Sequence, residues 1–113
     1  MKREQISKNI VADLKELAAL TSDADGAQRV AWTPTFKKAT EWFTQKMQAA
    51  GADVWTDAAG NSWAKFAGES KECIVIGSHL DSVPDGGWLD GALGVVAGMG
   101  IGALSLIHIS EPT

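Results

Sequence analysis

The sequence predicts an α/β fold. Three observations lead to it: two segments whose apolar residues recur at helical spacing, two short strand-like segments around a turn, and a continuous apolar run before a glycine-rich loop. The order of two helices, three strands and a final helix is typical of an α/β domain. With 113 residues, of which 45% are hydrophobic and 21% charged, the chain has enough apolar material for one modest core.

The first helix is expected between Ile6 and Leu20. Its apolar residues fall three or four positions apart and line one face, whereas Lys8 and Asp13 lie outside that face. A cluster of turn formers at 21–26 marks its end.

A second helix is expected to begin after Thr33, which is suited to be its N-cap, with Pro34 in the first position. Gly51 is a natural stop. Its apolar residues repeat at helical spacing: Phe36, Ala39, Trp42, Phe43 and Met47.

Two short strands are expected after the second helix. Residues 52–56 and 62–66 would form them, joined by a turn at 59–61, with Trp55 and Trp63 available for packing. The run CIVIGS at 73–78 is apolar without alternation, which predicts a strand buried on both faces and makes Cys73 a buried, inert thiol.

The residues that carry chemistry come directly after that run. His79 and Asp81 are two positions apart, so on an extended backbone they project to the same side. A histidine can ligate a metal through one ring nitrogen while a carboxylate holds the other N–H. After the glycine-rich loop at 82–87, Asp90 brings a second carboxylate, whose two oxygens can bridge two cations.

Each of these residues also has a structural interpretation. A histidine at a strand end often serves only as a hydrogen-bonding group. Asp90 stands where the last helix, which continues through Val95 and Met99, is expected to open, and an aspartate there is an N-cap. The run Asp85-Gly86-Gly87 has the composition of a simple turn.

Taken together, the pattern HLDSVP at 79–84, GG at 86–87 and DGALGV at 90–95 resembles the first metal-binding motif of the M20 metallopeptidase-like hydrolases. It looks most like their hydantoinase/carbamoylase group, which includes N-carbamoyl-L-amino-acid hydrolases and allantoate amidohydrolases. The segments RVAWTP at 29–34 and AAGN at 58–61 are similar to upstream segments of that group. Leu89 departs from the aromatic residue often found there.

The resemblance implies a function. His79 would ligate one metal, Asp90 would bridge two, and Asp81 would orient the His79 ring. The cofactor would be two divalent ions, Zn²⁺ or Mn²⁺-like, that acidify a bound water and polarise the carbonyl. The substrate would be a small linear ureido or N-carbamoyl amino acid, hydrolysed at a C–N bond, and the parent enzyme would be a homodimer.

The resemblance also implies ligands that this chain lacks. The family's Glu-Glu pair and later histidines have no counterpart, since Glu111 stands alone and the surroundings of His108 do not match. Residues 1–103 are therefore expected to be the N-terminal part of a truncated metallopeptidase-like catalytic domain, inactive alone. Residues 104–113 read without gaps as the translation of a transposase-based sequencing adapter, so we expect a non-native tail.

Composition excludes other classes of partner. Ten Lys and Arg against 14 Asp and Glu give a net charge of −4, which argues against nucleic acid and anionic membranes. One cysteine permits no internal disulfide, and the charged N-terminus is no signal peptide, so the cytoplasm is expected. Gly94, Gly98 and Gly102 mimic a membrane-helix face, but 92–103 is too short to span a bilayer.

Three alternatives stay open at this point. The chain could come from an aminoacylase or carboxypeptidase of the same superfamily. It could be a non-catalytic metal-binding module, or a purely structural α/β protein with His79 in its core. Metal content that a His79→Ala change leaves unaltered would favour the last.

Overall fold

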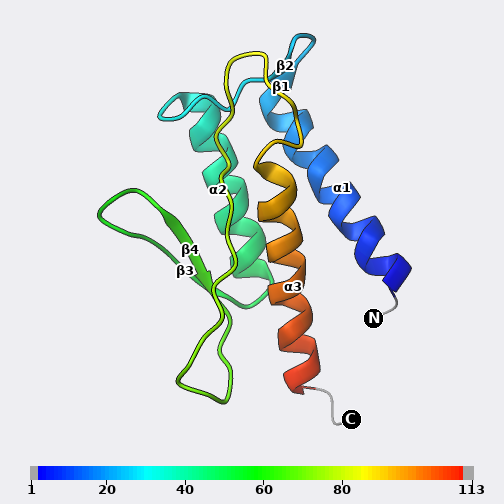
Figure 1. The fold of residues 1–113 in the computed structure, drawn as a ribbon, viewed down its shortest axis with the longest axis vertical. Coiled ribbons are helices and arrows are strands. Elements are labelled where there is room, and N and C mark those ends of the chain that lie inside the picture. The colour runs from blue at the N-terminus through cyan, green and yellow to red at the C-terminus, as the bar shows by residue number, and fades with distance from the viewer. Residues whose placement is uncertain (1–2, 111–113) are drawn as a thin grey trace.

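The computed structural model describes residues 3–110, with side chains up to residue 106. Its elements are α1 (Arg3–Thr21), β1 (Ser22–Asp23), β2 (Gly26–Ala27), α2 (Pro34–Ala49), β3 (Asp53–Thr56), β4 (Ser62–Lys65) and α3 (Ala92–Ser110). The three helices lie side by side, the β1–β2 hairpin follows the end of α1, and the β3–β4 hairpin extends beside α2 (Figure 1). The predicted mixture of helices and strands is confirmed.

The helix α1 packs against both α2 and α3 and supplies part of the core. Leu14 and Leu17 are buried on its inner face, as their spacing predicts. Its link to α2 is also polar, because the indole Nε1 of the buried Trp42 donates to Glu16 Oε1 at 2.8 Å. Trp42 therefore joins the apolar core while its polar atom is satisfied.

The helix α2 begins as its sequence predicts. Thr33 is the N-cap with an extended backbone (φ −90°, ψ 164°), its hydroxyl accepts the Phe36 N–H at 3.3 Å, and Pro34 occupies the first turn. This hydroxyl satisfies one of the N–H groups that a helix start leaves without a partner. Ala39 and Met47 are buried on the face turned to the core.

The β3–β4 hairpin is closed by one aspartate. Both Ala59 and Asn61 donate a backbone N–H to Asp57 Oδ1, and Trp63 Nε1 donates to Oδ2 at 2.8 Å. These donors, Trp63 first, lower the pKa of Asp57 to about 2. Trp55 and Trp63 face each other across the strands as a stacked pair with ring centroids 6.1 Å apart, so the expected strand packing of both is confirmed.

The prediction of a third strand at 73–78 is wrong. Residues 73–78 form no strand, Ile74 is 91% exposed, and Cys73 is an exposed thiol rather than a buried one. The physical reason is the lack of a partner strand. A strand needs a neighbouring strand for its backbone N–H and C=O groups, and no strand among the described residues pairs with this segment. An apolar run shows that a segment can be buried, but its burial depends on which elements reach it.

The same segment nevertheless runs along α3 (Figure 1). A side chain on Gly94 would overlap Ser78, and one on Gly98 would press on Ile76. The absence of side chains at these two positions thus lets the helix approach the 73–78 segment closely. No helix in the described range is long and apolar enough to cross a membrane.

The helix α3 begins at Ala92, two residues after Asp90, and continues past residue 103 without a break. Helix geometry thus does not separate 92–103 from 104–110, and the origin of 104–113 stays a prediction. Glu111 lies outside the described residues, and so does the side chain of His108.

Candidate metal centre

The site rests on an extended backbone at residues 79–82 whose side chains alternate. Leu80 and Ser82 are buried, and Leu80 belongs to the core cluster. The side chains of His79 and Asp81 are about half exposed, at 53% and 47%. The prediction that these two project to the same side is confirmed, since an extended chain turns every second residue outward.

The His79 ring lies between two carboxylates. Its Nδ1 is 3.2 Å from Asp81 Oδ1 and 3.0 Å from the Asp81 carbonyl oxygen. Its Nε2 is 3.7 Å from Asp90 Oδ1. Because both neighbours of Nδ1 are acceptors, the neutral ring carries its proton there and turns the Nε2 lone pair toward Asp90.

That arrangement fits a bound cation. A lone pair and a carboxylate that face each other are stabilised by a positive charge between them. Bonds from Zn²⁺ to histidine nitrogen and carboxylate oxygen are about 2.0–2.2 Å long. Two such bonds can span the 3.7 Å between Nε2 and Oδ1, so His79 and Asp90 are suited to hold one ion together.

Asp90 reaches His79 through a turn ahead of α3. Its N–H donates to the Gly87 carbonyl at 3.3 Å, and its side chain is 71% exposed. Among the described residues no N–H of α3 donates to this carboxylate, so the N-cap interpretation has no hydrogen bond behind it. Gly91 has a left-handed backbone (φ +74°), and a Cβ there would lie 2.5 Å from His79 Nδ1. Glycine at this position therefore lets the turn close onto the histidine.

Arg29 is a site residue that the sequence motif did not identify. It is fully buried, its Nε donates to the Leu80 carbonyl at 2.6 Å, and its Nη2 donates to the Asp90 carbonyl at 3.4 Å. Burial lowers the pKa of Arg29, and the charges of Asp81 and Asp90 act in the opposite direction. These partners are more than fifty residues away in sequence, so the only sequence signal for Arg29 was its place as the first residue of the RVAWTP segment.

The backbone around Arg29 is joined to the same loop. Ala27 and Gly86 exchange two hydrogen bonds of 2.9 and 3.0 Å, and the Ser82 N–H donates to the Arg29 carbonyl at 2.8 Å. The Ser82 hydroxyl accepts the Arg29 N–H at 3.0 Å. The 27–29 segment thus pairs with the glycine-rich loop at 82–87.

A second acidic group lies beside this pairing. Asp23, Asp25 and Asp85 bring their carboxylates within 4.8 Å of one another. The Gln28 amide donates to both Asp23 Oδ1 and Asp85 Oδ1, at 2.9 and 2.7 Å, and lowers the pKa of Asp23. This contact ties the β1–β2 hairpin to the loop, which is more than the simple turn expected of Asp85.

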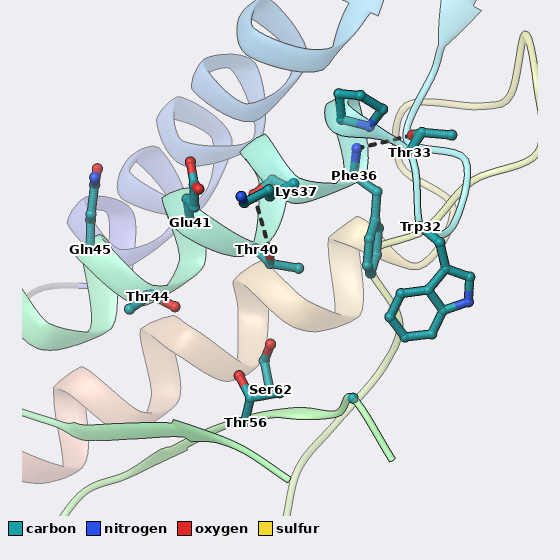
Figure 2. Close-up of a pocket in the computed structure, with 12 residues that line it drawn as sticks. Trp32, Thr33, Phe36, Lys37, Thr40, Glu41, Thr44, Gln45, Thr56 and Ser62 are labelled. Atoms are coloured by element: carbon teal, nitrogen blue, oxygen red, sulfur yellow. Dashed lines mark hydrogen bonds between the residues drawn. The ribbon is translucent and has the colours of Figure 1, made fainter. Parts of the chain in front are cut away.

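A groove of about 850 Å³ lies elsewhere, between α2 and the turn of the β3–β4 hairpin (Figure 2). Trp32 and Phe36 stand at one end of it with their rings edge to face, 5.7 Å between centroids. His79, Asp81 and Asp90 do not line it. The candidate metal centre is therefore an open surface site on a loop, separate from this groove.

The chain matches known proteins over most of its length, although no family profile matches it. It is 38% identical over 103 residues to allantoate deiminase 1 of Glycine max, covering 88% of this chain and 21% of that protein. It is 35% identical over 95 residues to N-carbamoyl-L-amino-acid amidohydrolase of Paenarthrobacter aurescens, covering 82% and 23%.

A solved structure agrees. An amidase of the hydantoinase/carbamoylase family from Burkholderia phymatum superposes with a TM-score of 0.72 at 36% identity, over 83% of this chain and 23% of that one. Fold and sequence thus both resemble those of the hydantoinase/carbamoylase family. The findings support the hydantoinase/carbamoylase group, of whose members the chain spans about a fifth to a quarter of the length. The predicted resemblance is confirmed.

Proposed function

We propose that His79 and Asp90 bind divalent metal ions in an amidohydrolase that cleaves C–N bonds of linear ureido or N-carbamoyl compounds. The observation that carries the proposal is the His79 ring, held at Nδ1 by Asp81 and turned at Nε2 toward Asp90. Asp90 would bridge two ions through its two oxygens. The names of the relatives, which specify allantoate and N-carbamoyl-L-amino acids, support the substrate class.

His79, Asp81 and Asp90 would have different roles in this site. Asp81 holds the Nδ1 proton, which fixes the tautomer and makes Nε2 the better ligand. Asp90 contributes negative charge on an exposed surface, where a small substrate can approach. Bound Zn²⁺ or Mn²⁺-like ions would polarise the substrate carbonyl and acidify water. A dimeric parent enzyme remains part of the same proposal.

Metal titration of the purified chain tests the site. We expect Zn²⁺ binding, followed by isothermal titration calorimetry, to weaken at least about 10-fold in His79→Ala and Asp90→Asn, because each removes a direct ligand. The control Asp53→Asn, an exposed carboxylate of β3, should bind as the unchanged chain does. If only Asp85→Asn abolishes binding, the ion sits in the acidic group of Asp23, Asp25 and Asp85 and the proposal is wrong.

Substrate class is tested with Mn²⁺, whose unpaired electrons relax nearby nuclei. Protons of an N-carbamoyl-L-amino acid should relax faster with the Mn²⁺-loaded chain than with the His79→Ala chain. The corresponding free amino acid is the matched control ligand and should show a smaller difference. Equal relaxation with both chains would contradict substrate binding at this site.

A further inference from the structure

The buried, positively charged side chain of Arg29 contacts both of the segments that carry candidate ligands, here called the two limbs of the candidate metal centre. The first limb carries His79 and Asp81 on either side of Leu80, and the second limb carries Asp90. Arg29 donates to the carbonyl of Leu80 on the first limb and to the carbonyl of Asp90 on the second. The two carbonyls are ten positions apart in sequence, and Arg29 comes from a third segment.

The chemistry of arginine suits this task. Its guanidinium is planar and presents its N–H donors in a fixed fork, so two acceptors that it binds are held at a set separation and angle. Arg29 is itself anchored, because its own backbone N–H and C=O bond Ser82. The side chain therefore cannot follow one limb without moving the other.

The burial of Arg29 argues for a specific role. Burying a charge costs free energy unless partners replace its water. Yet Nη1 of Arg29 has no hydrogen-bond partner among the described residues. The donors that do have partners go to the two carbonyls beside the candidate ligands. The positive charge of Arg29 also attracts Asp81 and Asp90, and this attraction offsets the repulsion between their two carboxylates.

We propose that Arg29 is a positioning residue that holds the His79 limb and the Asp90 limb together before any metal binds. This rests on the proposed function of His79 and Asp90, but its geometric part does not require a metal. It predicts that loss of the fork separates His79 from Asp90 while the helices remain folded.

A nuclear Overhauser effect measures this directly in the metal-free chain. The Cβ position of Gly91 lies 2.5 Å from His79 Cε1, so the Gly91 Hα and the His79 Hε1 protons are close enough to give a signal. We expect the signal to be lost in Arg29→Met, and also in Arg29→Lys, because an ammonium group lacks the rigid fork. The control Arg3→Met, on the exposed start of α1, should keep it.

Far-UV circular dichroism shows whether each variant still folds, and Leu17→Ala is a control with a weakened core but an intact site. A merely structural role predicts that the signal fades in Leu17→Ala as much as in the Arg29 variants. Persistence of the signal in folded Arg29→Met or Arg29→Lys would overturn the inference.

Zn²⁺ titration then separates this inference from the proposed function. We expect Arg29→Met to bind Zn²⁺ roughly 10- to 100-fold more weakly, as loss of a group that orients a ligand does. If His79→Ala lowers affinity and Arg29→Met does not, the metal site stands and the role of Arg29 is wrong. If His79→Ala binds as tightly as the unchanged chain, the metal site itself is wrong, and the proton signal alone decides whether Arg29 joins the limbs.

Discussion

Replacing Gly91 with alanine should destabilise the chain and open the candidate metal centre. The backbone at Gly91 is left-handed (φ +74°), which costs a residue with a Cβ roughly 1–2 kcal/mol. The new Cβ would also lie 2.5 Å from His79 Cε1 and Nδ1 and in contact with the His79 carbonyl oxygen. Overpacking of this kind adds about 1–3 kcal/mol. We therefore expect the free energy of unfolding to fall by about 2–5 kcal/mol.

Thermal unfolding followed by circular dichroism measures this loss. For a domain of this size, each kcal/mol lowers the melting temperature by roughly 4–8 °C, so a drop on the order of 10 °C or more is expected. Zn²⁺ affinity should fall as well, by about 10-fold or more, because His79 must move away from Asp90.

Gly87→Ala is the matched control for Gly91→Ala. It lies in the same loop, but a Cβ at Gly87 meets nothing within 4 Å and its backbone is not left-handed. Its melting temperature and Zn²⁺ affinity should stay close to those of the unchanged chain. Equal behaviour of the two alanine variants would refute the close approach of Gly91 to His79.

Two further predictions concern the elements around the site. Asp57→Asn should remove a pH dependence of the stability of the β3–β4 hairpin. The pKa of Asp57 is about 2 in the folded chain, below the ordinary 3.8. The carboxylate therefore stabilises the hairpin above about pH 4 and loses this effect as the pH falls toward 2. Near-ultraviolet circular dichroism of the stacked Trp55–Trp63 pair reports it. Thr33→Ala should lower the free energy of unfolding by about 1 kcal/mol in urea denaturation, because the Phe36 N–H loses its cap.

Both predictions have controls within the same elements. Asp53→Asn alters an exposed carboxylate of β3 and should leave the acid transition of the tryptophan signal unchanged. Thr44→Ala removes a threonine inside α2, away from its N-cap, and should cost less than Thr33→Ala. An acid transition that survives Asp57→Asn, or equal losses from the two threonine variants, would contradict these assignments.

The sequence by itself determined the features that depend on neighbours along the chain. The cap by Thr33 and the burial of Trp42 follow from residues within a few positions of each other, and so does the shared side of His79 and Asp81. Such patterns are readable because helix and strand periods decide which residues share a face. The motif at 79–95 also carried the family resemblance that the matches to amidohydrolases confirm.

Only the tertiary structure decided what depends on distant segments. It left the apolar run at 73–78 exposed, because the burial of a strand requires neighbours that pair with it and cover it. It brought Asp90 to His79 through the turn at Gly91, and it buried Arg29 against carbonyls more than fifty residues away. Residue type indicates which groups can bind a metal or carry a charge. Their convergence depends on long-range contacts, which no local period encodes.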